Sequence, residues 1–229
     1  MAKGSLEGEV QFALAWLEEH STGKDRANLA RFGINAKKAF GVSMANIQVL
    51  GKRLGRNHEL AAALWNTGWY EARMLTSFVD EPERVTAAQM DRWCRDFDNW
   101  GICDTLCFCL FDRTPHAWSK VSEWGLQSDE FVKRAGFALL ASLAGHDKTA
   151  GDDQFLASFP LIESAATDER NFVKKGVSWA LRRIGSRNAV LKAASMDMAR
   201  RLADSADAAP RWVGKDALRD FTREKRGKA

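Results

Sequence analysis

Two segments of the chain, 41 residues apart, share one pattern and constrain the fold most strongly. Residues 131–140 and residues 172–181 both open with Phe, Val, Lys and a second basic residue, and apolar residues follow at helical spacing. A repeat of about 40 residues is typical of HEAT-type units, each of which is a pair of helices. Because one unit cannot bury its apolar face alone, the pattern predicts an all-α, curved solenoid of antiparallel helix pairs. An irregular helical bundle is the alternative.

The remaining chain also favours helices. Its four prolines fall between apolar-periodic segments, and no clear run of alternating β-branched residues occurs. Thr86 and Gln89 form a capping-box pattern ahead of an apolar stripe. Thr114, followed by proline, predicts another helix start, and Ser128 and Thr167 are expected to cap the two repeat helices. Other apolar helix positions are Leu60, Leu64, Ala72, Leu75, Val79, Met90, Trp93, Cys94, Phe97, Trp118, Val121 and Trp124.

Length and hydropathy predict one helical-repeat domain over residues 1–229, with a frayed basic tail at about 223–229. No apolar stretch is long enough for a transmembrane helix, and the first residues lack the apolar block of a secretory signal. A cytoplasmic location, in a bacterial-type cytosol or nucleoid, is therefore expected. The four cysteines, which lie between Cys94 and Cys109, are expected to be reduced core thiols. Since they lack Cys-x-x-Cys spacing and the four histidines are scattered, neither a metal nor a cofactor is predicted.

Charge is unevenly distributed along the chain. Residues 170–229 hold 16 Lys and Arg against 6 Asp and Glu, whereas residues 1–169 hold 18 against 24. A basic C-terminal part beside an acidic remainder favours a polyanionic partner. The alternative is a solvated basic tail.

Trp179 lies off the apolar stripe of its own helix. With Phe172 at zero and about 100° per residue, that stripe centres near about 120°, whereas Trp179 falls near about 340°. Lys175 and Arg182 fall on the same side, and Arg134 takes the place of Lys175 in the preceding repeat. Stacked repeats would align these residues along a concave basic groove, suited to a phosphate backbone and a cationic or π-rich ligand. Core packing is the alternative for any one of the nine tryptophans.

A second unusual place is the segment around Trp100 and Asp104. These residues are four apart and share a helix face if a helix begins here, with Ile102, Cys103 and Leu106 on the other side. An acid beside a ring on a face outside the core indicates either a site or a structural feature resembling a cap.

The order and spacing of several segments resemble the AlkD-type family of DNA alkylation-repair glycosylases, over about residues 40–222. The supporting segments are Glu59-Leu-Ala-Ala-Ala-Leu-Trp65, Glu71-Ala-Arg73, Met90-Asp-Arg-Trp-Cys-Arg-Asp-Phe-Asp-Asn-Trp-Gly-Ile-Cys-Asp104, Phe131-Val-Lys-Arg-Ala-Gly-Phe137, Phe172-Val-Lys-Lys-Gly-Val-Ser-Trp-Ala-Leu-Arg182 and Lys215-Asp-Ala-Leu-Arg219.

The resemblance implies a concave stack of HEAT-like helix pairs and hydrolysis of N3- or N7-alkylated purines from duplex DNA, without a base pocket. Its functional residues fall on Trp100, Asp104, Arg134 and Trp179. Asp104 would stabilise the oxocarbenium-like sugar, the tryptophans would line the walls and Arg134 would hold a phosphate. No obligate protein partner is expected. Further contacts to the DNA backbone are expected from Lys133, Lys174, Lys175 and Arg182.

One position departs from the family pattern. The residue after the first tryptophan is commonly acidic in relatives and is Gly101 here, and the first 40 residues match poorly. A catalytically silent relative that binds branched or distorted duplex therefore stays open as an alternative. A HEAT-type scaffold for protein partners, without a nucleic-acid role, is the second alternative.

Overall fold

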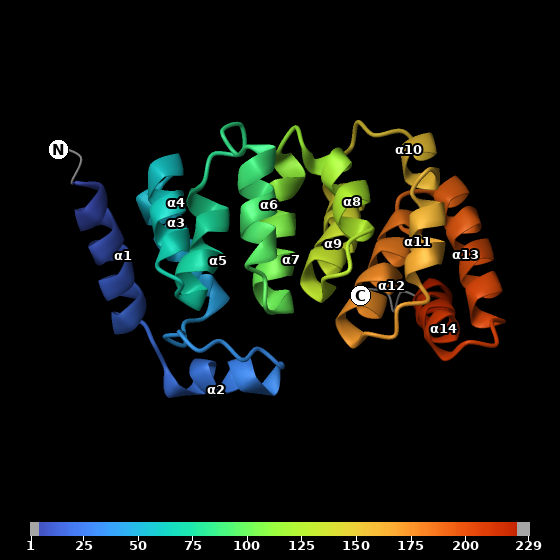
Figure 1. The fold of residues 1–229 in the computed structure, drawn as a ribbon, viewed down its shortest axis with the longest axis horizontal. Coiled ribbons are helices and arrows are strands. Elements are labelled where there is room, and N and C mark those ends of the chain that lie inside the picture. Colours follow the sequence, from blue (N-terminus) through green and yellow to red (C-terminus); the bar gives the residue numbers. More distant parts are fainter. Residues whose placement is uncertain (1–4, 224–229) are drawn as a thin grey trace, which may run out of the picture. The chain divides into compact units, whose positions relative to one another are not determined.

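The computed structural model describes residues 5–223, and within that range the chain is helical without any strand (Figure 1). The all-α prediction is confirmed. The predicted tail lies outside the described residues, apart from Arg223 at the end of the last helix. None of the described helices is both long and apolar enough to cross a membrane. The α-helices are α1 (Leu6–Glu19), α2 (Gly23–Arg31), α3 (Met44–Leu54), α4 (His58–Asn66), α5 (Tyr70–Val79), α6 (Ala87–Arg95), α7 (Trp100–Cys109), α8 (Ala117–Gly125), α9 (Glu130–His146), α10 (Asp152–Leu156), α11 (Phe159–Ala165), α12 (Asn171–Gly185), α13 (Ala189–Ala203) and α14 (Ala208–Thr222), with a 3₁₀ turn η1 (Phe111–Arg113) after α7.

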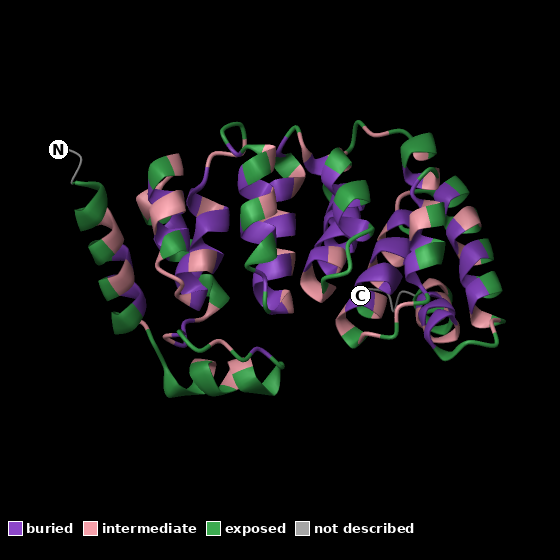
Figure 2. Ribbon diagram, in the orientation of Figure 1, coloured by how far each residue is buried: buried purple, intermediate pink, exposed green. Residues whose placement is uncertain are grey.

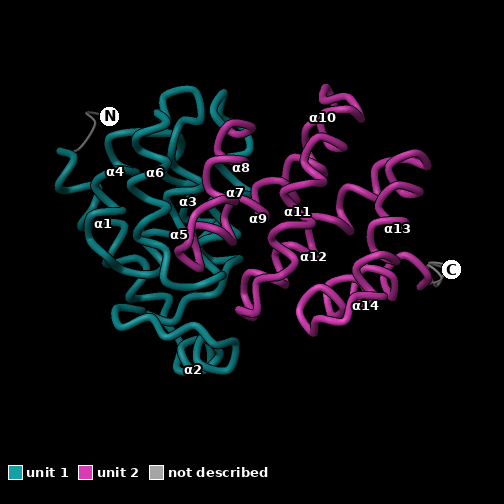
Figure 3. The backbone as a smooth tube through the Cα atoms, turned by 45° about the vertical axis from the view of Figure 1, so that its right-hand side comes forward, with its two compact units in different colours: residues 1–116 teal, residues 117–229 magenta. Residues whose placement is uncertain are grey.

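The backbone divides into two compact units, unit 1 with residues 1–116 and unit 2 with residues 117–229 (Figure 3). In unit 1, α5 packs against α3, α4 and α7, and α1 packs against α4. In unit 2, α12 packs against α9, α13 and α14, and α8 packs against α9. The interpretation as one domain stays a prediction.

Each unit buries the helix faces that meet a neighbour and leaves the opposite faces to solvent (Figure 2). In unit 1 the indole rings of Trp65 and Trp93 stack with their centroids 4.4 Å apart, and both are almost fully buried. Phe97 and Phe111 pack edge-on and tilted around them. Most of the buried area therefore comes from aromatic side chains at helical spacing, as the sequence predicts for this region.

Helix α2 differs from the other helices of unit 1. It has no buried residue and lies crosswise to them (Figure 1). The segment that follows α2 returns to the core through Glu71, whose carboxylate is fully buried. Its two oxygens accept the backbone N–H groups of Phe40, Gly41 and Val42 at 2.9, 2.8 and 3.3 Å. The Tyr70 N–H also donates to the Lys38 carbonyl at 2.9 Å, so the start of α5 fixes residues 38–42.

The two segments with the repeated pattern form neighbouring helices in unit 2, α9 and α12. Equivalent residues meet at their N-terminal ends, where the Phe131 and Phe172 ring centroids lie 5.2 Å apart. At their C-terminal ends, Arg187 donates to the Ala144 carbonyl at 2.9 Å. Because both pairs of like ends meet, α9 and α12 run in the same direction, as equivalent helices of stacked repeats do.

Helix starts with a local Ser, Thr or Asn cap follow their sequence signals best. The Thr86 hydroxyl accepts the Gln89 N–H at 3.1 Å, as predicted, although the Gln89 amide donates to Asp80 at 2.8 Å and leaves the capping box incomplete. Asn99 accepts the Ile102 N–H at 3.0 Å at the start of α7.

Three predicted caps are wrong. Thr114 donates to the Phe111 carbonyl at 2.8 Å, which closes η1, and α8 begins only at Ala117. Helices α9 and α12 begin after Asp129 and Arg170, neither of which makes a side-chain cap bond. Instead, the carbonyl of Ser128 accepts from Arg170 at 2.6 Å and Thr167 donates to the Ser164 carbonyl at 2.8 Å. These hydroxyl residues serve the preceding turn, because a local hydrogen bond there competes with capping.

The Glu71 carboxylate gives the first prediction. Glu71→Gln turns one acceptor oxygen into an NH₂ group that faces backbone N–H donors, so at least one buried N–H loses its partner. We expect the free energy of unfolding to fall by about 1–3 kcal/mol in urea titration. Glu19→Gln, at the exposed end of α1, is the control and should change it by less than about 0.5 kcal/mol. Equal stability of the two variants would contradict this anchoring role.

Candidate functional site

Trp100 is the first residue of α7, and Asp104 lies one turn further on. Ile102, Cys103 and Leu106 are buried, whereas Trp100 and Asp104 are half-buried. The structure thus confirms that the helix begins at Trp100 and that the ring and the carboxylate share a face opposite the buried residues.

The first 40 residues hold Trp100 in place. Its indole N–H donates to the backbone carbonyl of Phe32 at 2.9 Å. Sequence reasoning missed this contact, which joins residues 68 positions apart. No local pattern announces a carbonyl acceptor, so only the fold could reveal it. A segment whose match to the family is poor therefore positions a candidate catalytic ring.

Gly101, the departure from the family pattern, sits in a closely packed place. A Cβ atom at this position would lie 2.6 Å from the Tyr70 hydroxyl oxygen, 3.0 Å from Ile34 Cδ1 and 3.1 Å from Asn99 Oδ1. A contact of 2.6 Å is shorter than van der Waals packing allows. Tyr70 therefore occupies the space that an acidic side chain at position 101 would need, and the two departures belong together.

In unit 2, Arg134 of α9 is buried, with 7% of its surface exposed. Its Nη1 donates to the Phe172 carbonyl at 2.7 Å, which ties α9 to the first turn of α12. Gly176 lets the two helices approach, because a Cβ there would lie 3.5 Å from Arg134 Cγ. The guanidinium therefore has a structural role, beside which the predicted phosphate contact stays a prediction.

Trp179 and the cations around it lie on α12. Trp179 is half-buried, Lys175 is exposed and Arg182 is half-buried, so this face does reach solvent as the helical wheel predicts. Arg182 lies 3.8 Å from Asp216 and 3.5 Å from Asp220, both on α14. Carboxylates that the wheel of α12 alone could not show therefore partly neutralise the face.

Two further predicted DNA contacts also have partners. Lys133 Nζ lies 3.2 Å from Asp168 Oδ2, and Arg170 donates to the same carboxylate at 2.6 and 2.9 Å. The hydrogen bonds from Arg170 lower the pKa of Asp168 to about 2, against the opposing effect of burial and with help from Lys133. The Lys174 amine stands 5.3 Å from the centroid of the Trp212 ring, a cation–π contact.

The structure thus groups the predicted residues in two sets. Unit 1 brings Trp100 and Asp104 together, and unit 2 brings Trp179 together with Lys174, Lys175 and Arg182 on α12, with Arg134 on the neighbouring helix. Action of both sets on one lesion stays a prediction.

Cysteines play no evident part in the site. Cys94, Cys103 and Cys107 are buried free thiols, as predicted, and Cys109 is half-buried. Burial raises the pKa of the Cys107 thiol well above its ordinary value, which keeps it protonated.

A substitution at Gly101 tests the packing against Tyr70. Gly101→Ala should lower the free energy of unfolding by about 1–3 kcal/mol, because the new methyl group must displace a buried phenol. Gly23→Ala is the matched control, since a Cβ on Gly23 meets nothing within 4 Å. Urea unfolding of both variants measures the difference, and a neutral Gly101→Ala would show that the space is not filled.

The Asp168 carboxylate predicts a pH dependence of stability. Its pKa is lower in the folded chain than in the unfolded chain, so its stabilising effect is complete above the unfolded value near 4 and is lost as pH falls toward about 2. Asp168→Asn should lower the free energy of unfolding by about 2 kcal/mol at about pH 6 and by roughly half as much at about pH 3. Asp153→Asn, on the exposed first turn of α10, is the control. A loss from Asp168→Asn that does not change with pH would refute the ion-pair interpretation.

Comparison with known proteins identifies the family. A family model described as DNA alkylation repair enzyme matches residues 13–221. A solved structure described as a new family of proteins related to the HEAT-like repeat DNA glycosylases, with affinity for branched DNA structures, is similar with a TM-score of 0.77 and 17% identity, over 92% of this chain and 94% of that chain. A designed armadillo repeat protein in complex with a peptide gives a TM-score of 0.38 and 12% identity, over 95% of this chain and 100% of that chain. No curated protein matches. The HEAT-like fold predicted from the repeat is confirmed, and the chain belongs to the DNA alkylation repair enzyme family.

Proposed function

We propose that this chain is a DNA glycosylase that hydrolyses the N-glycosidic bond of N3- or N7-alkylated purines in duplex DNA, as a step of base-excision repair. The observation that carries the proposal is the pair Trp100 and Asp104, one turn apart on the face of α7 opposite its buried residues. Membership of the DNA alkylation repair family supports it. A cytoplasmic location, beside the DNA, is part of the proposal.

The reaction suits a single carboxylate. Alkylation at N3 or N7 makes the purine cationic, so the base leaves as a neutral molecule and needs no general acid. The sugar gains oxocarbenium character as the bond breaks, and a negative charge beside it stabilises the transition state more than the ground state. Asp104 supplies that charge and orients the attacking water, which adds to the anomeric carbon and loses a proton.

Aromatic rings recognise the positive charge of the lesion. Trp100 and Trp179 present indole faces to the cationic base and sugar, with an attraction on the order of 1–2 kcal/mol each when water is excluded. The hydrogen bond from Trp100 to Phe32 fixes one of these rings before DNA binds. Less side-chain entropy is then lost on binding.

Phosphate contacts come from the predicted cations of unit 2, Lys133, Lys174, Lys175, Arg134 and Arg182. Their present partners rank them. Lys175 is exposed, and no hydrogen bond or ion pair involves it within residues 5–223, whereas Lys133 and Arg182 already face carboxylates. A phosphate at Lys175 breaks no existing interaction. We therefore expect Lys175 to contribute most of the salt-dependent affinity.

Gly101 favours a second candidate function. A relative that lacks the acidic side chain after the first tryptophan could bind branched or distorted duplex without releasing a base. The structurally similar protein with a TM-score of 0.77 is described as having affinity for branched DNA structures. Junction binding without base release is the outcome that would favour this function.

Asp104→Asn separates catalysis from binding. We expect it to slow the release of 7-methylguanine from a duplex by about 100-fold or more, because the amide keeps the shape and loses the charge. Affinity for the same duplex should change by less than about threefold. Glu83→Gln, which removes an equally exposed charge from the loop before α6, is the control and should keep full release.

Release is measured with excess enzyme in a single turnover, and binding by anisotropy on the same duplex. An unchanged rate in Asp104→Asn would remove the carboxylate from the mechanism. Tight binding with no release by the unsubstituted protein would instead support the silent DNA-binding relative. Absence of any DNA affinity would support the protein scaffold.

A further inference from the structure

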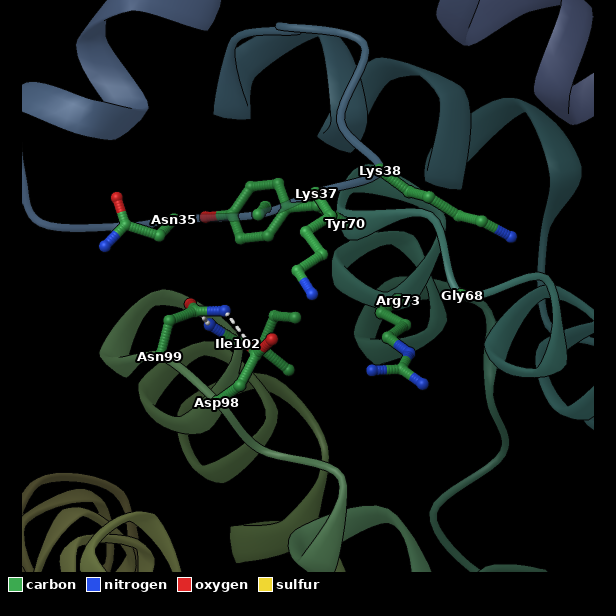
Figure 4. A pocket seen from close by; sticks show the side chains of 10 residues that line it. Asn35, Lys37, Lys38, Gly68, Tyr70, Arg73, Asp98, Asn99 and Ile102 are labelled. Atoms are coloured by element: carbon green, nitrogen blue, oxygen red, sulfur yellow. Dashed lines mark hydrogen bonds between the residues drawn. The ribbon is translucent and has the colours of Figure 1, made fainter.

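A cavity of about 420 Å³ lies in unit 1 beside the start of α7 (Figure 4). Its walls come from residues 35–38, from Tyr70 and Arg73 on α5, and from residues 98–102. Cavities of this size hold small ligands in other proteins. Asn99, which lines it, directly precedes Trp100, and the loop that forms one wall begins at Phe32, the acceptor of the Trp100 indole. The cavity therefore adjoins one half of the proposed catalytic pair.

The cavity contains a buried polar group without a partner. Tyr70 is 7% exposed, and its hydroxyl makes no hydrogen bond with any residue in the described part of the chain. Figure 4 shows this hydroxyl on the side of Asn35. Burial raises the pKa of Tyr70, and the carboxylates of Glu71 and Asp98 raise it further, so the phenol stays protonated and can donate. Such a group is costly to leave without a partner, which points to a ligand.

Asn35 offers a second unused polar group. Its side chain is exposed at the cavity wall and no hydrogen bond uses it among residues 5–223. An amide presents a donor and an acceptor side by side, the pattern that the edges of nucleobases match. Asn99 is different, since its oxygen accepts from Ile102 and its nitrogen donates to Asp98 at 2.7 Å.

Cations outnumber the one carboxylate of the cavity. The Lys37 amine has no ion-pair partner in residues 5–223, and Figure 4 shows it extending into the space between Tyr70 and Asp98. Arg73 is held from behind, with Nη2 3.6 Å from Asp96 and its guanidinium 4.8 Å from the centroid of the Trp65 ring. A fixed guanidinium beside a free amine suits a phosphate group.

We propose that this cavity binds one nucleotide extruded from the DNA, with its base against Tyr70 and Asn35 and its phosphate against Lys37 and Arg73. The proposal rests on the proposed action on DNA and adds a nucleotide site that the sequence did not suggest. Gly101 is the residue that permits it, because any side chain there would meet the Tyr70 hydroxyl. The departure from the family pattern thus accompanies a pocket, and extrusion of a base costs least at damaged or unpaired positions.

The test is calorimetric titration of the full chain with deoxyguanosine 5′-monophosphate, with deoxyguanosine and inorganic phosphate as separate arms. We expect the nucleotide to bind at least fivefold more tightly than either part. Tyr70→Phe and Asn35→Ala should each weaken it about fivefold through one lost hydrogen bond, and Lys37→Ala by a similar factor. Lys52→Ala, an equally exposed lysine in the last turn of α3, should change it by less than twofold.

Asp104→Asn keeps the two proposals apart, since it should abolish base release and leave nucleotide binding unchanged. If the chain releases 7-methylguanine while Tyr70→Phe, Asn35→Ala and Lys37→Ala all bind the nucleotide normally, the pocket proposal fails and the glycosylase proposal stands. Nucleotide binding no tighter than phosphate binding also overturns the pocket. If no base is released and the nucleotide binds as expected, the glycosylase proposal fails alone.

Discussion

The buried carboxylate of Glu71 is the interaction on which the candidate site of unit 1 depends. It binds three successive backbone N–H groups and so turns a loop without regular structure into a rigid wall. That loop continues back to Phe32, whose carbonyl holds Trp100. A buried charge is tolerable only when its hydrogen bonds are complete, and here the backbone completes them. One side chain of α5 thereby positions both the aromatic ring on α7 and the wall of the neighbouring pocket.

Unit 2 uses its charges in a comparable way. Arg134 joins α9 to α12 through a backbone carbonyl, and Asp168 joins Lys133 to Arg170. A cation that carries part of the fold is a poor independent contact, because a phosphate must compete with its present partner. Basic residues therefore differ in what they offer to DNA, and the exposed Lys175 offers most.

Sequence patterns could predict the features that depend on neighbours along the chain. The 41-residue repeat gave the pairing of α9 with α12, and the position of Trp100 after a capping Asn99 gave the shared face with Asp104. Contacts over longer separations were out of reach. Neither the grip of Glu71 on a loop 30 residues away nor the contact of Tyr70 with position 101 has a local signal. A glutamate within the apolar stripe of α5 is the one trace that the first contact leaves in the sequence.

A crystal structure of the chain bound to a duplex with a non-hydrolysable analogue of an N7-alkylated purine nucleotide tests the central claim most directly. The account predicts the Asp104 carboxylate beside the anomeric carbon of that nucleotide, with the indole of Trp100 against the sugar or base. A complex in which the duplex contacts neither residue, with Asp104 open to solvent, would contradict the claim that this family member acts on alkylated DNA through the first turns of α7.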